Sequence, residues 1–386
     1  MARAIRLGAR GLYTTGPNPR VGCVLVREGE ILGEGWHRRA GEPHAERVAL
    51  AVAGARARGA TAYVNLEPCC HQGRTPPCTD ALLEAGVSRV VAAMKDPNPL
   101  VAGKGLDVLR ARGVRVDVGI LEEQARSLNP GFVKRMTRGL PYTRCKLAAS
   151  LDGRTAMASG ESKWITSEAA RRDVQYLRAR SSAVVTGVGT MLADDPSLNV
   201  RLKAEDLTWV DAEEAVPQPV RVVVDSRLRT PGDAGMLRDG GPVLIACVDQ
   251  EPSHAVRLES AGARIYRCAE SGGRVDLVYL FRYLADQEIN EVLLEAGPTL
   301  AGAALQAGLV DELTLYLAPH LMGDRGRGLF GLPGLERMRD RIDLALTDTR
   351  MIGPDLRITA VPRAHSGALG PEPRSAQGGL GTGESQ

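Results

Sequence analysis

Short runs rich in β-branched residues alternate with helical runs between residues 20 and 118, and this rhythm limits the folds open to the chain. The predicted strands are 21–26, 60–66, 89–94 and 114–119. The predicted helices are 44–59 and 78–86, and both end at a glycine, as helices often do. Alternation of this kind predicts a mostly parallel sheet with helices packed against it.

A second α/β series follows residue 140, and 386 residues are many for a single core. Segment 127–143 interrupts the rhythm, so we expect domains at 1–140 and 141–363. The strands expected in the second domain lie within 142–153, 181–189, 219–226, 241–248, 290–297 and 311–319. The tail 364–386 is rich in Gly, Ser and Pro and is predicted to be disordered, because it has little to bury.

Composition excludes several classes of protein. Charged residues make up 25% of the chain and the net charge is +3, which argues against a polybasic nucleic-acid binder. The first 16 residues lack the apolar core of a secretory signal, and no apolar run approaches the roughly 20 residues of a membrane span. Seven cysteines without framework spacing predict a reducing, cytoplasmic compartment, where clustered thiols more often bind metal than pair.

Three of these cysteines lie in the stretch NLEPCCHQGRTPPC (65–78), downstream of PHAERVAL. In the spacing H-x-E, His44 and Glu46 stand about 200° apart around a helix, so one can hold a metal while the other reaches the water beside it. H-x-E followed by P-C-x-x-C is a known zinc-deaminase signature, although here the cysteine spacing is P-C-x8-C. We expect one Zn²⁺ per chain on His44, Cys69 and Cys78, with Glu46 moving protons and Cys70 a bystander.

Other interpretations of this cluster remain open. A structural zinc site would usually have four ligands, and His71 is a candidate for the fourth. Alternatively, Cys69 and Cys70 are inert thiols.

The second half contains candidate phosphate contacts. EAGPTLAGAAL (295–305) passes from a strand through Gly297 and Pro298 into a helix, whose free N–H groups suit a phosphate; an ordinary strand–helix turn is the alternative. Ser226 and Arg227 follow another strand and could hold the 2′-phosphate of NADPH, or form a polar strand end. The segment TGVGTML (186–192) does not match the dinucleotide-binding pattern G-x-G-x-x-G, because Leu192 stands where the third glycine would be.

The segments TTGPNPRVGCVLV, GEPHAERVAL and LEPCCHQGRTPPCTDAL resemble the deaminase half of the bifunctional riboflavin-biosynthesis enzymes, whose fold is similar to that of cytidine deaminase. The resemblance implies an N-terminal three-layer α/β/α domain and the same zinc and proton-shuttle residues. It also implies that the pyrimidine and ribose phosphate are bound by Asn18, His71, Arg74 and Thr75.

YTRCKLAASLDGRTAMASGESKWITS, QYLRARSSAVVTGVGTMLADDPSLNVR and LLEAGPTLAGAALQAGLVDEL resemble the reductase domain of the same family, a dihydrofolate-reductase-like α/β domain that uses NADPH. By this resemblance Lys146 lies beside the reacting sugar carbon. The positions matching NADP contacts are Ala148, Trp164, Thr190, Asp194, Ser226, Gly297, Pro298, Thr299, Leu300, Ala301, Gly302 and Ala303. The positions matching substrate contacts are Ser162, Arg178, Leu198, Arg201 and Glu295.

The resemblance implies hydrolytic deamination of 2,5-diamino-6-(5-phosphoribosylamino)pyrimidin-4-one, then NADPH-dependent reduction of its ribosyl group to give 5-amino-6-(5-phosphoribitylamino)uracil. It implies a small-molecule partner, neither nucleic acid nor membrane, and it allows a homo-oligomer. One alternative is a nucleic-acid or nucleoside zinc deaminase with an accessory nucleotide-binding domain. A nucleic-acid enzyme would need basic stripes interleaved with aromatics, whereas this chain is 4% aromatic. A second alternative is a structural zinc module joined to a nucleotide sensor domain, in which Glu46 would have no catalytic role.

Overall fold

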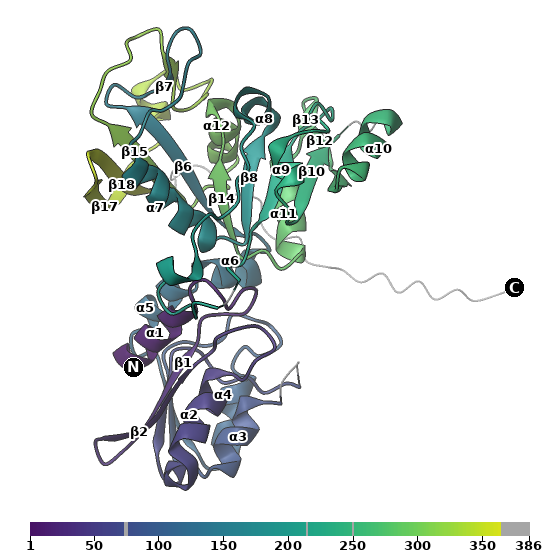
Figure 1. Ribbon diagram of the computed structural model, residues 1–386. Helices are drawn as coiled ribbons and strands as arrows, with labels where there is room; N and C mark the ends of the chain where they lie inside the picture. The colour runs from purple at the N-terminus through teal and green to yellow at the C-terminus, as the bar shows by residue number, and fades with distance from the viewer. Residues whose placement is uncertain (73–75, 214, 249–250, 364–386) are drawn as a thin grey trace, which may run out of the picture.

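The computed structural model describes residues 1–72, 76–213, 215–248 and 251–363, which form two α/β bodies joined through helix α6 (Figure 1). The disorder predicted for 364–386 lies outside the described residues. Within the described part of the chain, no helix combines the length and apolar character needed to cross a membrane.

The N-terminal body is a five-stranded sheet with helices on both faces. Its strand order is β2-β1-β3-β4-β5, from β1 (Gly22–Arg27), β2 (Glu30–Trp36), β3 (Thr61–Val64), β4 (Arg89–Ala92) and β5 (Arg115–Val118). Its helices are α1 (Ala2–Gly8), α2 (Ala45–Ala53), α3 (Cys78–Glu84), α4 (Lys104–Ala111) and α5 (Glu122–Leu128). Cys23 and Leu25 pack in the core with α2, whereas Val24 packs with α1, as the alternation of a strand requires.

This sheet is less parallel than the sequence predicts. Strands β3, β4 and β5 run parallel, but β1 is antiparallel to both of its neighbours. The sequence also gives no sign of β2, because glycines at 33 and 35 weaken its strand character. Those glycines let α2 approach closely, since a Cβ at Gly33 would lie 2.3 Å from the Ala49 carbonyl oxygen and one at Gly35 would lie 2.3 Å from that of Ala45.

The C-terminal body is built on a nine-stranded sheet of order β11-β10-β9-β8-β14-β6-β15-β18-β17. From β11 to β15 neighbouring strands run parallel, and β18 and β17 add an antiparallel edge. The strands are β6 (Tyr142–Ser150), β8 (Ala183–Gly187), β9 (Val220–Val224), β10 (Val243–Cys247), β11 (Ala263–Arg267), β14 (Glu291–Glu295), β15 (Glu312–Ala318), β17 (Leu344–Ile352) and β18 (Asp355–Pro362). The six strands that the sequence predicts here all form.

Helices and two small ladders complete this body. The helices are α7 (Glu168–Ala179), α8 (Val188–Asp194), α9 (Gly235–Arg238), α10 (Pro252–Ser260), α11 (Leu277–Asp286) and α12 (Pro298–Gln306). The ladders pair β7 (Arg154–Ala156) with β16 (Arg327–Gly328) and β12 (Glu270–Ser271) with β13 (Arg274–Val275). Two separate apolar clusters lie against the large sheet, as expected for a sheet covered on both faces.

Helix α6 (Pro130–Arg138) connects the two bodies and packs against both (Figure 1). Phe132 belongs to the N-terminal core. On the other side, Lys134 Nζ lies 2.6 Å from an Asp311 carboxylate oxygen, and Arg135 Nε donates to Asn290 Oδ1 at 2.7 Å. The segment that interrupts the sequence rhythm is therefore largely an ordered helix of the interface.

A buried carboxylate, Glu291, lies at the centre of this interface. Its Oε1 is 2.6 Å from Arg20 Nη2 of the N-terminal body, and its Oε2 accepts a hydrogen bond from Arg144 of β6. Arg180 Nη2 lies 3.9 Å from the same Oε2. Burial alone would raise the pKa of Glu291, but these three positive charges outweigh burial and hold the pKa below its ordinary value.

We expect Glu291→Gln to destabilise the protein, because it leaves buried guanidinium groups without a counter-charge. Breaking a buried ion pair typically costs about 3–5 kcal/mol, and urea denaturation would measure the change in the free energy of unfolding. The matched control is Glu122→Gln, which breaks an exposed pair with Arg126 and should cost less than about 1 kcal/mol. Equal effects of the two substitutions would contradict this account.

The lowered pKa of Glu291 also predicts an acid sensitivity. A carboxylate whose pKa is lower in the folded than in the unfolded chain stabilises the folded state at pH values above the unfolded pKa, which is about 4.3 for Glu. That stabilisation is lost as the pH falls from there through the lower pKa of the folded state. Between about pH 5 and about pH 3, the urea midpoint of the wild type should therefore fall more steeply than that of Glu291→Gln. Parallel pH profiles would show that Glu291 is not responsible.

Candidate functional site

Three potential metal ligands converge at one end of the N-terminal sheet. The ligand atoms of His44, Cys69 and Cys78 all lie within 4.8 Å of one another. His44 is the N-cap of α2, Cys69 follows β3, and Cys78 is the first residue of α3. The backbone N–H of Cys78 lies 3.3 Å from the Cys69 sulfur, so the start of a helix faces a thiol, where the helix dipole favours negative charge.

The spacing of these atoms fits a zinc ion. A tetrahedral zinc with one imidazole at about 2.1 Å and two thiolates at about 2.3 Å separates nitrogen from sulfur by roughly 3.6 Å. Here His44 Nδ1 lies 3.5 Å from Cys69 Sγ and 3.4 Å from Cys78 Sγ. A hydrogen bond with Cys78 lowers the pKa of the Cys69 thiol to about 4, while the same contact and burial raise the pKa of Cys78.

Glu46 lies one residue into helix α2 and is buried, with 3% of its surface exposed. Burial and the neighbouring Cys69 raise the pKa of its carboxyl group, and Cys78 is within hydrogen-bonding distance of it. A buried carboxyl with a raised pKa, beside the ligand cluster, is suited to accept and release a proton.

Glu67 fixes the turn that carries Cys69. Its two carboxylate oxygens accept backbone N–H groups from Asp96, Gly103, Gly105 and Leu106 at 2.9–3.3 Å. One carboxylate therefore ties the end of β3 to the loop after β4 and to the start of α4. The parallel pairing of β3 with β4 predicts that these loops meet, but the sequence alone does not mark Glu67 as their connection.

Two more buried titratable residues stand near the cluster and were missed from the sequence. The His37 ring centroid is 5.2 Å from that of His44, and its Nε2 lies 3.0 Å from Asn18 Nδ2. Asp96 follows β4, and burial raises the pKa of its carboxyl to about 7. Asn18 is thus connected to the ligand residue His44 through His37.

The other residues predicted for this pocket are His71, Arg74 and Thr75. His71 is exposed and does not join the described ligand cluster, so three described residues, not four, converge. Arg74 and Thr75 lie outside the described residues.

The C-terminal body contains a cavity of about 1460 Å³ at the carboxyl ends of its central parallel strands. Single small-molecule pockets usually measure about 300–1,000 Å³, so this one has room for more than one ligand. The predicted residues that line it are Lys146, Ala148, Ser162, Trp164, Arg178, Thr190, Asp194, Leu198, Arg201, Ser226, Glu295, Gly297, Pro298, Thr299, Leu300 and Ala303.

Ala301 and Gly302, which the sequence also assigned to the cofactor, do not line this cavity. Ala301 is fully buried in the apolar core, and a Cβ at Gly302 would lie 2.0 Å from the Gly331 carbonyl oxygen. Successive residues of a helix point in different directions, so only part of α12 can face a ligand. Its first residues, Pro298 to Leu300, do so, with Gly297 as N-cap.

Arg178 and Glu295 form a two-pronged ion pair in the cavity wall. The Nε–Oε1 and Nη2–Oε2 distances are 2.6 and 3.0 Å, and Arg178 Nη1 also donates to the Asn199 carbonyl oxygen at 3.1 Å. Burial lowers the pKa of Lys146, which lies on β6, and the Glu295 charge opposes that shift. Arg178 is therefore committed to protein partners, whereas Arg201 at the rim is exposed.

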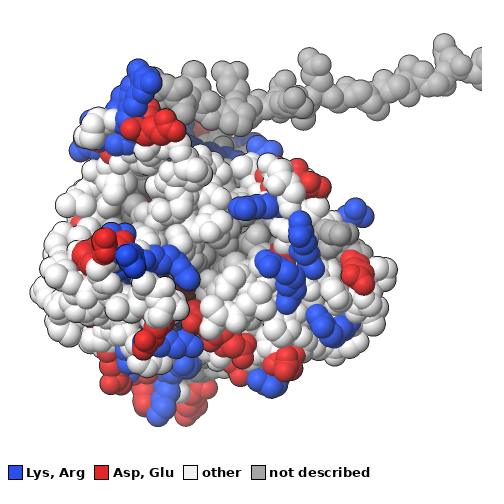
Figure 2. Space-filling view, turned by 90° about the horizontal axis from the view of Figure 1, so that it is seen from above, with Lys and Arg blue, Asp and Glu red and all other residues white. Residues whose placement is uncertain are grey.

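Arg227, Arg229 and Arg274 line the same cavity as Ser226. The Ser226 hydroxyl oxygen accepts the N–H of Val275 at 3.2 Å, which joins the end of β9 to the β12–β13 ladder. Viewed onto this half of the molecule, the surface is hollowed and Lys and Arg side chains gather on the side of β10 and β13 (Figure 2). Arg229 and Arg274 were missed because neither lies in a recognisable motif.

Comparison with known proteins agrees with both halves of this description. Residues 1–94 match the family model described as cytidine and deoxycytidylate deaminase zinc-binding region, and residues 141–358 match the model described as RibD C-terminal domain. The riboflavin biosynthesis protein RibD of Escherichia coli is 52% identical over 92% of this chain and 96% of its own length. The riboflavin biosynthesis protein RibD of Haemophilus influenzae is 50% identical over 94% of this chain and 96% of its own length.

Solved structures show the same two-body architecture. RibD of Acinetobacter baumannii, form 1, superposes with a TM-score of 0.86 at 47% identity, covering 94% of this chain and 98% of that one. A diaminohydroxyphosphoribosylaminopyrimidine deaminase/5-amino-6-(5-phosphoribosylamino)uracil reductase of Thermotoga maritima gives a TM-score of 0.80 at 32% identity, covering 94% and 97%. The chain therefore belongs to the RibD family and is a bifunctional enzyme of riboflavin biosynthesis, with a cytidine-deaminase-like deaminase domain followed by a dihydrofolate-reductase-like reductase domain.

Proposed function

We propose that the deaminase half, which we delimit as 1–140, removes an amino group from 2,5-diamino-6-(5-phosphoribosylamino)pyrimidin-4-one. We propose that the reductase half, 141–363, then uses NADPH to convert the ribosyl group to ribityl. The observation that carries the first step is the convergence of His44, Cys69 and Cys78 beside a buried carboxyl, Glu46. All seven cysteines are free thiols, which suits a cytoplasmic enzyme.

His44, Cys69 and Cys78 would hold Zn²⁺, since two thiolates and an imidazole are ligands that zinc prefers. The metal would activate a water molecule for attack on C2 of the pyrimidine. Glu46 takes a proton and passes it to the departing amine, a role that its burial and raised pKa support. Asn18 and His37 would orient the pyrimidine, because their hydrogen bond places both beside His44.

In the reductase half, the nicotinamide would supply a hydride to C1′ of the opened ribose. Lys146 would donate a hydrogen bond beside that carbon, a role supported by its position in the cavity lining. Arg178 fixes the Glu295 carboxylate, whose charge acts on Lys146. We assign the direct contact with the substrate phosphate to Arg201 rather than Arg178, because the Arg178 charge is paired with Glu295 and three of its five N–H donors already bind protein groups. The start of α12 would receive the cofactor diphosphate, and Ser226 with its three arginines the 2′-phosphate.

We expect Glu46→Gln to lower the rate of ammonia release by about 10²–10⁴-fold, because it removes the proton shuttle. Zinc content by atomic absorption should stay at one equivalent per chain, as the ligands are untouched. The control Glu84→Gln changes an exposed carboxylate of α3 and should leave both quantities unchanged. Ammonia release at the wild-type rate in Glu46→Gln would refute the assigned role.

We expect Arg274→Gln to raise the KM for NADPH by about 10–100-fold, the effect of losing one charged hydrogen bond to phosphate, while the KM for NADH changes little. Steady-state absorbance at the nicotinamide band would measure both values. Arg282→Gln, on the exposed side of α11, is the matched control. An equal loss with both cofactors would show that Arg274 does not read the 2′-phosphate.

A further inference from the structure

Lys146 lines the reductase cavity, and its ammonium has three N–H donors to direct. Within the described residues this ammonium donates no hydrogen bond, and its protein neighbours act on it through burial and charge. Burial disfavours the charged form, so the groups beside Lys146 decide whether it stays an ammonium and where its donors point. Two such groups, Glu295 and Tyr316, flank it.

The strand register places these three side chains on one face of the large sheet. Strand β6 lies between β14 and β15, and Lys146 pairs with Glu295 on one side and with Thr314 on the other. Tyr316 lies two residues beyond Thr314, so its side chain projects from the same face. The Lys146 Nζ lies over the Tyr316 ring, 5.9 Å from the ring centroid. A cation within about 6 Å of an aromatic face is attracted to the ring.

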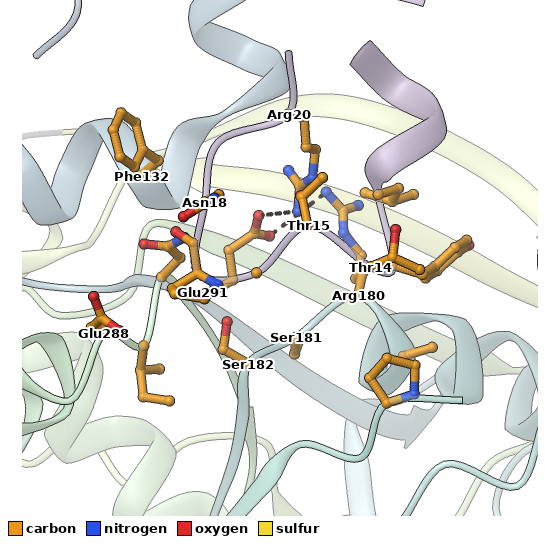
Figure 3. A pocket seen from close by; sticks show the side chains of 18 of the residues that line it. Thr14, Thr15, Asn18, Arg20, Phe132, Arg180, Ser181, Ser182, Glu288 and Glu291 are labelled. Atoms are coloured by element: carbon orange, nitrogen blue, oxygen red, sulfur yellow. Dashed lines mark hydrogen bonds and ion pairs between the residues drawn. The ribbon is translucent and has the colours of Figure 1, made fainter. Parts of the chain in front are cut away.

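Strand β14 is held at both of its ends. It begins at Glu291, the carboxylate paired with Arg20 and Arg180 in Figure 3. It ends at Glu295, whose carboxylate forms the two-pronged ion pair with Arg178 of α7. The acidic group on this side of the ammonium therefore has a fixed position.

The ring of Tyr316 is held in place as well. Tyr316 is fully buried, and its hydroxyl donates to an oxygen of Asp173, which also lies on α7. Arg357, the partner of Tyr316 on β18, donates to the same oxygen at 2.9 Å. Tyr316 is not among the described residues that line the cavity, so it can act on a ligand only through Lys146. Helix α7 thus fixes both groups that flank the ammonium.

We propose that Tyr316 is a positioning residue for the reductase step, whose ring face holds the Lys146 ammonium beside Glu295 with its N–H donors directed into the cavity. This inference rests on the role given to Lys146 in the proposed function. An aromatic face attracts a cation without taking a hydrogen bond from it, so the donors stay free for a ligand. Tyr316 does not itself touch the substrate.

Groups on every neighbouring element act on the charge of Lys146. Glu295 of β14 favours the ammonium, Arg178 of α7 opposes it, and the adjacent thiol of Cys145 adds to the effect of the acid. The ring of Tyr316 also favours the ammonium, because it attracts only the charged form. Removing the ring should therefore lower the pKa of Lys146, whereas a loss of packing alone should leave that pKa in place.

Competitive acetylation of the full chain measures this pKa directly, since an amine reacts in its uncharged form and mass spectrometry isolates the Lys146 peptide. We expect Tyr316→Met, which fills much of the same space, to lower the pKa of Lys146 by about 0.5 to 1 pH unit. Tyr316→Phe keeps the ring face and should leave the pKa unchanged. The matched control is Tyr283→Leu, which removes a ring stacked on Tyr266 in the same body and should also leave it unchanged.

The pH profile of NADPH oxidation provides a second measurement. Because the ammonium is the form that donates, the alkaline limb of kcat/KM should move to lower pH in Tyr316→Met by the same amount as the pKa of Lys146. It should stay in place in Tyr316→Phe and Tyr283→Leu. Ammonia release should be the same in all four proteins.

Equal pKa values of Lys146 in wild type and Tyr316→Met would overturn the proposal, and so would a decrease in Tyr316→Phe as large as that in Tyr316→Met. If Tyr316→Met does not fold, a fluorinated phenylalanine at this position keeps the size of the ring and removes negative charge from its face. A pKa of Lys146 equal to that in Tyr316→Phe would then refute the contact. Acetylation needs no turnover, so a ring-dependent pKa in a wild type that consumes no NADPH would establish the contact but refute the proposed function, and with it the role of Tyr316 in reduction.

Discussion

The Glu291 carboxylate holds together segments that lead to both active sites. Its partner Arg20 lies two residues beyond Asn18, which hydrogen-bonds to His37 beside the metal ligands. Its partner Arg144 lies two residues before Lys146 on β6. A single buried acid with several arginines is stable only in one arrangement, since each unpaired charge would remain desolvated. The relative position of the two bodies therefore follows from this cluster and from α6, which packs against both.

Within each body, the chemistry depends on where strands and helices end. His44 and Cys78 stand at the starts of two helices and Cys69 follows a strand, so ligands 34 residues apart in the sequence meet within hydrogen-bonding distance. In the reductase half, the ends of β8, β9 and β14 and the start of α12 surround one cavity. Parallel sheets regularly place ligands at the carboxyl ends of their strands, and both sites obey this rule.

The sequence predicts those parts that depend on local pattern. The alternating strands and the H-x-E helix start can be read directly, and the cysteine spacing identifies the three residues that converge. It does not predict β2, because its glycines serve close packing against α2 rather than strand formation. His37, Glu67 and Asp96 were missed since their importance comes from neighbours distant in sequence. For Arg178, the sequence shows a charge but not that Glu295 already neutralises it.

The proposed function requires that two chemistries occur in order on one chain. A single-turnover experiment would mix the diaminopyrimidinone ribosyl phosphate and NADPH with excess zinc-loaded enzyme, and follow ammonia and nicotinamide absorbance in the same sample. We predict that each substrate releases one ammonia and consumes one NADPH, with the NADPH signal lagging behind ammonia. NADPH consumption that precedes ammonia release, or proceeds without it, would contradict the proposed order.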